Sequence, residues 1–171
     1  CVHRYSDRCE NYEEIFSFVK KDIAQECDKL LKAAVDWDRR TPNIIDSMFS
    51  ETCIEKLQDQ STFSAKYNNY GFHGAGIANA ADALCAVKKL IFEEKKYTAN
   101  ELINALNENF EGYETLHTDL CNCPKMGNND DYVDTLASDI MTVFCTHMKT
   151  LKSVGGGICR PGTGSAQEYI N

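Results

Sequence analysis

Glycines surround a histidine in residues 71–76, which read Gly-Phe-His-Gly-Ala-Gly. A glycine-rich loop before a helix can hold phosphate on the free amides of the first helical turn. The match to nucleotide loops is poor, because no Lys-Ser/Thr pair follows and Asn79 replaces the last glycine of Gly-x-Gly-x-x-Gly. Glycines that permit close backbone packing are favoured instead. His73 is the most exposed-looking titratable group of this loop, and a structural or simply exposed role is favoured for it.

A second cluster, Cys121-Asn122-Cys123 with His117 nearby, suggests a metal site. Zinc sites usually separate a Cys pair by two or more residues and add a second pair, which this sequence lacks. Structural thiols are therefore favoured. Residues 128–134 are acidic but lack the alternating ligands of a calcium loop, so helix capping is expected there. With no Gly-x-Ser-x-Gly motif present, the residues by themselves predict neither a catalytic residue nor a metal site.

These segments lie in a chain that reads as helices joined by short loops. Apolar residues recur with a 3.6-residue period over residues 12–35, which predicts a long amphipathic helix. Pro42 can open a second helix. Its expected apolar face consists of Ile44, Ile45, Met48, Phe49, Cys53, Ile54 and Leu57. A third helix is expected over residues 78–94.

Capping residues predict where the later helices begin and end. Thr98 and Glu101 form a capping box, and the helix that follows carries an apolar stripe to Phe110 and is expected to end at Gly112. A last helix begins near residues 128–131 and runs to about Leu151. Residues 61–76 have little helical periodicity, and the Gly-rich residues 155–165 can hold a short strand. The prediction is an α/β, mostly helical segment with one or two short strands.

Composition limits the class of function. The 171 residues are about one domain, and their net charge of −8 argues against binding to nucleic acid or to an anionic membrane. No apolar run approaches the roughly 20 residues of a membrane span, and no signal peptide is evident. The nine cysteines show no disulfide framework, which favours reduced thiols and a cytoplasmic location. A secreted binding domain with four disulfides is the alternative.

Five stretches, in order and at these distances, resemble glycyl radical enzymes of the pyruvate formate-lyase superfamily. They are KYN (66–68), GAGIANAADAL (74–84), KKLIF (88–92), NFEGYE (109–114) and PKMGNNDDYVD (124–134). The resemblance covers about residues 12–165. It implies a ten-stranded α/β barrel around two finger loops, one with a catalytic Cys and one with a radical Gly. It also implies a partner activase that uses S-adenosylmethionine and an iron–sulfur cluster to install the glycyl radical, a small-molecule substrate and a possible homodimer.

The residues that carry the family's radical have no counterpart in this sequence. The family's Cys follows a Gly and precedes an aliphatic residue and an acid, whereas Cys159 precedes Arg160-Pro161 and Cys85 lies in a helical pattern. The family's Gly sits in Arg-Val-x-Gly-aromatic, and the nearest string, residues 153–156, lacks both the Arg and the aromatic. No residue is therefore assigned a catalytic role.

The resemblance implies a substrate pocket instead. Residues 67–76 match the family stretch whose strand and loop line the barrel near the substrate. The pocket candidates are Tyr67, Asn68, Phe72 and His73. Asn128, Asp130 and Asp131 match a family run that is interpreted as helix capping.

Two functional hypotheses follow. In the first, residues 1–171 are a single region inside a radical lyase, dehydratase or decarboxylase, inactive alone and completed by the remainder of the barrel. A chain that begins with Cys1 instead of Met fits this expectation. In the second, the chain is a non-catalytic partner subunit or degenerate paralogue that packs against another barrel portion. A barrel segment should expose apolar surface where missing strands would pack.

Overall fold

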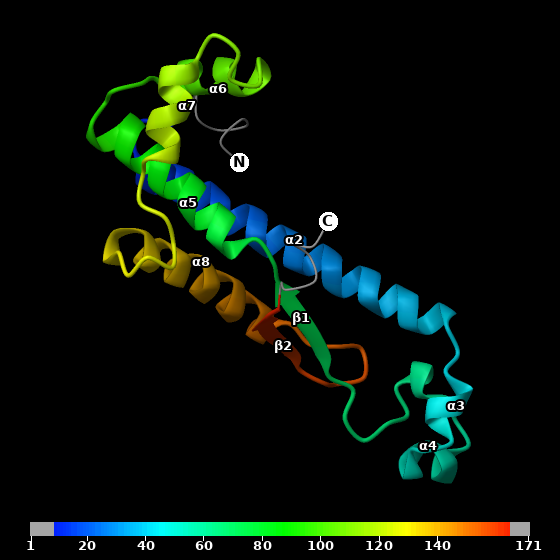
Figure 1. Ribbon diagram of the computed structural model, residues 1–171. Helices are drawn as coiled ribbons and strands as arrows, with labels where there is room; N and C mark the ends of the chain where they lie inside the picture. The colour runs from blue at the N-terminus through cyan, green and yellow to red at the C-terminus, as the bar shows by residue number, and fades with distance from the viewer. Residues whose placement is uncertain (1–8, 165–171) are drawn as a thin grey trace. The chain divides into compact units, whose positions relative to one another are not determined.

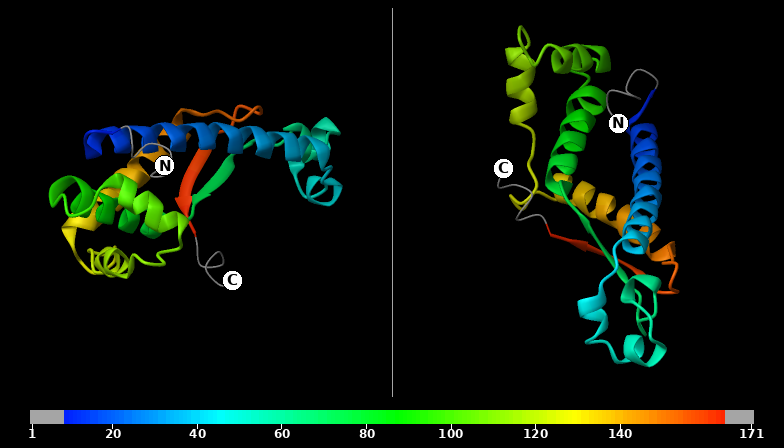
Figure 2. Two further views of the ribbon diagram at one scale, coloured as in Figure 1. Left: turned by 90° about the horizontal axis from the view of Figure 1, so that it is seen from above. Right: turned by 90° about the vertical axis from the view of Figure 1, so that its right-hand side faces the viewer.

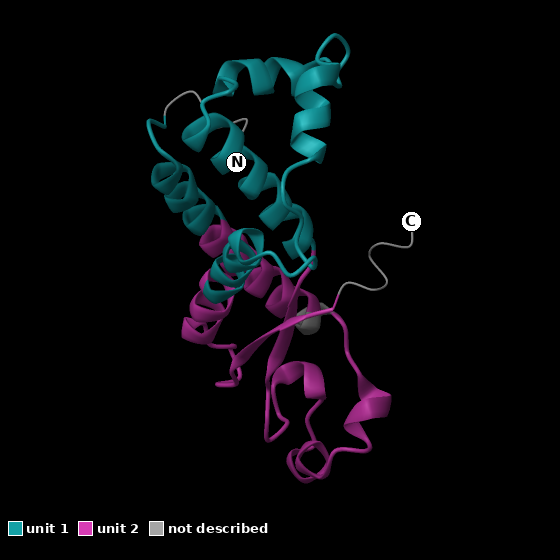
Figure 3. Cartoon of the chain, turned by 60° about the vertical axis from the view of Figure 1, so that its left-hand side comes forward, with its two compact units in different colours: residues 1–22, 76–142 teal, residues 23–75, 143–171 magenta. Residues whose placement is uncertain are grey.

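The computed structural model describes residues 9–164, except the side chains of residues 38–40, and it is mostly helical with two short strands (Figure 1). Cys1 and Ser165, which the sequence analysis included, lie outside the described residues. The chain divides into two compact units (Figure 3). Unit 1 comprises residues 1–22 and 76–142, and unit 2 comprises residues 23–75 and 143–171.

The predicted long helices are confirmed. Helix α2 (Tyr12–Arg40) runs from unit 1 into unit 2, as does α8 (Asp131–Thr150). The third predicted helix consists of α5 (Ile77–Val87) and the π-helical segment η3 (Lys88–Glu93), which continues it. No helix within residues 9–164 is both long enough and apolar enough to cross a membrane.

Unit 1 forms its core around α5. Five residues of this helix are buried, namely Ala81, Leu84, Cys85, Ala86 and Val87. Ala86 clusters with Leu90 of η3 and with Cys123, and Tyr97 and Leu120 pack against that cluster. The apolar spacing of residues 81–91 therefore buries one helix face, as the sequence predicts.

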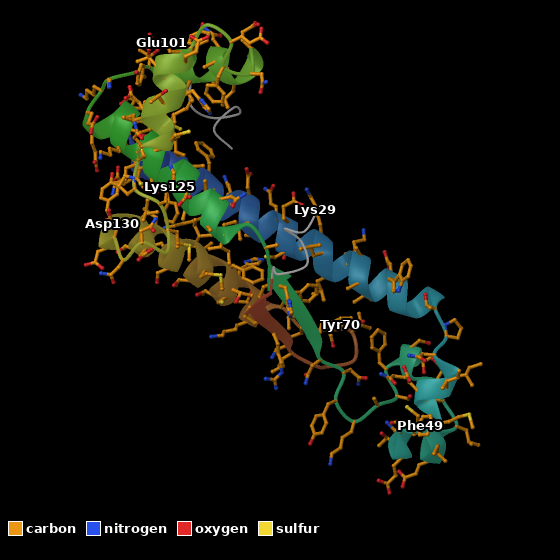
Figure 4. All side chains as sticks on the ribbon, viewed as in Figure 1. Lys29, Phe49, Tyr70, Glu101, Lys125 and Asp130 are labelled. Atoms are coloured by element: carbon orange, nitrogen blue, oxygen red, sulfur yellow. The ribbon has the colours of Figure 1, made fainter. Side chains whose placement is uncertain are left out.

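The predicted caps are confirmed (Figure 4, Glu101 and Asp130). Helix α6 (Ala99–Asn107) begins with a capping box, because the Glu101 amide donates to the Thr98 hydroxyl and the Thr98 amide donates to the Glu101 carboxylate. At the start of α8, the amide of Tyr132 donates to the Asp130 carboxylate at 3.0 Å. Both carboxylates satisfy amides that the first helical turn leaves unpaired.

The predicted end of α6 is wrong. The helix ends at Asn107, and Asn109 and Phe110 adopt left-handed φ angles of 50° and 64°. The Phe110 amide donates to the Ala105 carbonyl at 2.7 Å, which turns the chain before Gly112 is reached. Helix α7 (Glu114–Cys121) follows and was not predicted, because its only buried residue is Leu116 and its apolar pattern is correspondingly weak.

The prediction of one helix after Pro42 is also wrong. The chain instead forms two short helices, α3 (Ile44–Ser47) and α4 (Glu51–Lys56), followed by the 3-10 turn η2 (Gln60–Thr62). The predicted apolar face is largely exposed; of its seven residues, only Cys53 is buried. The physical reason is that the Ser47 hydroxyl bonds to Asn43 and Asp59, which turns a polar side of α3 inward.

Unit 2 contains the sheet. Strands β1 (Tyr70–Gly74) and β2 (Cys159–Thr163) pair in parallel, with Phe72 opposite Pro161, and lie side by side in every view (Figure 2). Two strands in this position agree with the prediction. Phe72 packs against a core cluster formed by Cys27, Met148 and Cys159.

Candidate functional site

Asn68 joins the loop before β1 to the turn before β2. Its side-chain amide donates to the carbonyl oxygens of Phe63, Ala65 and Gly155 at 3.1, 2.9 and 3.3 Å. Its backbone carbonyl accepts a hydrogen bond of 2.8 Å from the Ser153 hydroxyl. An amide side chain with this many backbone partners holds two segments together, since each buried carbonyl requires a donor.

Glycine is required in the turn that faces Asn68. A Cβ atom on Gly157 would lie 1.8 Å from the Asn68 carbonyl oxygen, and one on Gly155 would lie 2.7 Å from the Asn68 Cβ. Both distances are far below van der Waals contact, so any side chain would force the segments apart. The run Gly155–Gly157 thus permits the close approach that sets the parallel register of β1 and β2.

Tyr67 is at a pocket beside this junction. The pocket has a volume of about 450 Å³. Its lining includes Trp37, Phe63, Tyr67, Asn68 and Tyr70. The side chain of Tyr67 is 75% exposed and that of Trp37 is 70% exposed, so both rings are available to a neighbouring molecule or segment. Trp37 was not predicted here, because the fold alone brings the end of α2 to this loop.

Phe72 and His73 lie apart from that pocket, on opposite faces of β1. Phe72 packs into the core of unit 2, whereas His73 is exposed. The prediction that His73 lies in a loop is wrong, because His73 belongs to β1 and pairs with Gly162 of β2. The His73 ring lies beside Gly162 of β2 and Gly164 just after it, where a Cβ on Gly164 would be 2.6 Å from the ring Nδ1. The absence of a side chain on Gly164 therefore makes room for the imidazole.

Four thiols of the described chain are held protonated by burial. Burial raises the pKa of Cys27, Cys123 and Cys159, and it raises the pKa of Cys85 to about 11. A raised pKa keeps a thiol protonated and weakly nucleophilic. Seven cysteines of the described chain, from Cys27 to Cys159, are free thiols. The disulfide-rich alternative is correspondingly weakened.

Cys121 and Cys123 contact different groups. Cys121 Sγ is 3.7 Å from His117 Nε2, one helical turn away, and Cys123 Sγ donates to the Asp119 carbonyl. Within residues 9–164, no three His, Cys, Asp or Glu side chains are placed to hold a metal ion.

Comparison with known proteins identifies the family. A model of the family described as pyruvate formate lyase-like matches residues 4–170. The chain therefore belongs to the pyruvate formate-lyase superfamily of glycyl radical enzymes, as the sequence motifs indicated.

Two curated relatives are dehydratases. The chain is 34% identical over 153 residues to trans-4-hydroxy-L-proline dehydratase of Clostridioides difficile, which covers 86% of this chain and 19% of that protein. It is 35% identical over 127 residues to (2S)-3-sulfopropanediol dehydratase of Klebsiella oxytoca, covering 72% of this chain and 15% of that protein. The chain thus spans about a fifth or less of the length of these relatives.

A solved structure gives the same result for the fold. The glycerol-bound B12-independent glycerol dehydratase of Clostridium butyricum superposes with a TM-score of 0.82 at 32% identity. The superposition covers 91% of this chain and 20% of the dehydratase.

Proposed function

We propose that these residues are an internal segment of a longer glycyl radical lyase or dehydratase that acts on a small hydroxylated molecule. In the complete enzyme, a thiyl radical would remove hydrogen from the substrate, after a radical-S-adenosylmethionine activase has installed the glycyl radical. The Cys and Gly of that chemistry lie outside this sequence, so the segment is inactive alone. Three relatives named above, whose names specify hydroxyproline, sulfopropanediol and glycerol, support the substrate class.

The observation that carries this proposal is the two-stranded parallel sheet. Within the described residues, the sheet contains only β1 and β2. Parallel sheets occur almost only as larger sheets that are covered on both faces, because crossover helices pack on them. Isolated two-stranded sheets are marginal in water. We infer that the outer edges of β1 and β2 pair with further strands of a barrel.

The two faces of β1 suggest where the substrate lies. Helices cover the Phe72 face, since Phe72 packs with Cys27 of α2 and Met148 of α8. Successive strand residues point to opposite faces, so Gly71 and His73 occupy the helix-free face. In a barrel surrounded by helices, the helix-free face points inward. We therefore assign His73 to the barrel interior as a substrate-contacting residue.

The other pocket candidates receive different roles. Asn68 holds the loop and the turn together, and Phe72 anchors β1 to the helices. Tyr67 and Trp37 flank the pocket of about 450 Å³ and are available for contact with the rest of the enzyme. Only His73 of the four predicted residues is proposed to touch the substrate directly.

The absence of both radical motifs favours one alternative, a partner subunit that completes a barrel supplied by another chain. In such a subunit, the outer edges of β1 and β2 would pair with strands of the other chain. In this case the segment would be a separate gene product and would carry no radical.

The test uses the full-length protein, activated anaerobically with its activase and incubated with glycerol, trans-4-hydroxy-L-proline and 3-sulfopropanediol. We expect a Gly-centred radical signal in electron paramagnetic resonance and turnover of a hydroxylated substrate. His73→Ala should retain the radical signal and lower kcat/KM by about tenfold or more. His117→Ala, at an exposed position of α7, should change neither. Turnover that His73→Ala leaves unchanged would contradict the role of His73 in substrate contact. The absence of a Gly-centred radical in the full-length protein would contradict the proposed function.

A further inference from the structure

Residues 43–64 form a small module with a polar interior, which we call the α3–α4 module. Its buried residues are Ser47, Cys53 and Ser64, with exposed fractions of 9%, 2% and 2%. Asp59 accepts hydrogen bonds from the Asn43 amide, the Ser47 hydroxyl and the Ser61 amide at 3.1, 3.0 and 2.8 Å. Hydrogen bonds hold this module together, and no large aliphatic or aromatic side chain is fully buried in it.

The outside of the module is apolar. Six large apolar side chains are more than half exposed, with Phe49 at 86% and Leu57 at 91%. Phe49 is labelled in Figure 4. The other four are Ile44, Ile45, Met48 and Ile54. Scattered exposed hydrophobic residues are ordinary, but six within 14 residues form a concentration that usually marks an interaction surface. A free-standing domain buries its large apolar side chains, whereas this module exposes them and buries two serines and a cysteine.

The backbone at Leu57 agrees with this interpretation. Leu57 has a φ of 52°, in the left-handed region that Gly or Asn normally occupies at a helix end. A leucine there is strained and its side chain is exposed, although the amides of Leu57 and Gln58 close the helix end by donating to the carbonyls of Ile54 and Cys53. Such strain persists when surrounding structure stabilises it, and a covering partner would do so.

Charge narrows the identity of the partner. Asp59 accepts hydrogen bonds inside the module, which leaves three exposed carboxylates, Asp46, Glu51 and Glu55, and one lysine. That lysine, Lys56, donates to the Ser64 carbonyl at 2.9 Å and lies against the module's own backbone. Two copies related by a twofold axis would place the same acidic patch against itself, which is unfavourable. The complementary surface is therefore apolar with a basic rim.

We propose that the α3–α4 module is the docking surface for another part of the same full-length polypeptide, an apolar surface rimmed by Lys or Arg. The inference rests on the proposed function, because relatives are about five times longer than the portion matched here and so supply such a surface. The module fixes this segment to the remainder of the enzyme at a place distinct from the sheet edges.

The first test substitutes Phe49 in the full-length protein. Phe49→Asp should lower the midpoint of thermal unfolding by about 3 °C or more while the native mass stays unchanged. Phe49→Leu, which keeps an apolar side chain, should shift it by less than about 1 °C. An unchanged midpoint for Phe49→Asp would show a free surface. A fall in native mass would show that a second copy occupies it, and either result would overturn the proposal.

The second test examines the rim charge. Reversing Glu51 and Glu55 to Lys should lower the midpoint more than changing both to Gln, because Lys would face a basic rim. A double Lys variant as stable as the double Gln variant would refute the basic rim.

The third test uses the unsubstituted protein, so it does not depend on whether a variant folds. Under hydroxyl-radical labelling, Met48 and Phe49 should oxidise at about a tenth or less of their rate in urea-unfolded protein. Near-unfolded rates, or protection that disappears on dilution, would contradict an intramolecular partner. If the proposed function fails but this inference holds, protection persists in a protein that forms no radical. If only this inference fails, the radical forms while Met48 and Phe49 label freely.

Discussion

Asp59 shows how a single carboxylate organises local structure. Hydrogen bonds from Ser61, from the Asn43 amide and from the Ser47 hydroxyl lower its pKa from 3.8 to about 2. These bonds favour the charged carboxylate, which accepts hydrogen bonds from groups that the chain would otherwise leave unpaired.

This depressed pKa predicts an acid-sensitive module. A carboxylate whose folded pKa is lowered contributes stability that is fully present above pH 3.8 and is lost as the pH falls toward 2. Amide exchange in residues 43–62, corrected for intrinsic rates, should accelerate over this interval. In Asp59→Asn, which cannot titrate, exchange should no longer change there. The same acid response in Asp59→Asn would show that another group is responsible.

The helix caps could be predicted from single residues, but the long-range hydrogen bonds of a polar side chain could not. Thr98, Glu101 and Asp130 could be predicted, since their partners lie within a few residues. The hydrogen bond from the Asn68 amide to Gly155, 87 positions away, was not predicted. A partner so distant in sequence leaves no local pattern to read.

At the scale of elements, the close contact between Asn68 and the glycine turn controls the sheet. Gly157→Ala should destabilise the β1–β2 pairing by about 3 kcal/mol or more, because its Cβ would overlap the Asn68 carbonyl. Gly156→Ala is the matched control, with a φ of 75° but open space, and should cost about 1–2 kcal/mol. Amide exchange of Tyr70, whose amide donates to the Ile158 carbonyl, reports both effects. The reverse order of exchange rates would refute the close-packing explanation.

The elements themselves were predictable in proportion to their burial. Helices α2, α5 and α8 carry strong 3.6-residue patterns, and the Gly-rich end was expected to hold the strand that is β2. Residues 44–57 misled the prediction, because their apolar residues are spaced as a core face yet point outward. The apolar spacing of residues 44–57 predicts that one face is covered, but it does not say which part of the polypeptide covers it.

At the scale of the whole molecule, two independent features support the proposal that these residues are a segment of a longer protein. The sheet contains two parallel strands within the described residues, and the α3–α4 module presents apolar side chains outward. The relatives provide the explanation, since the matched portion is about a fifth of their length. The family model establishes membership, and the proposed substrate class rests on the names of the relatives.

The most direct measurement is the intact mass of the native gene product, isolated under anaerobic conditions from the organism that makes it. We predict a mass several times the 19.2 kDa of these residues, with peptides from this sequence inside it. A native product of 19.2 kDa would contradict the claim that the chain is a segment of a longer radical enzyme. It would instead support a separate subunit that completes a barrel from another chain.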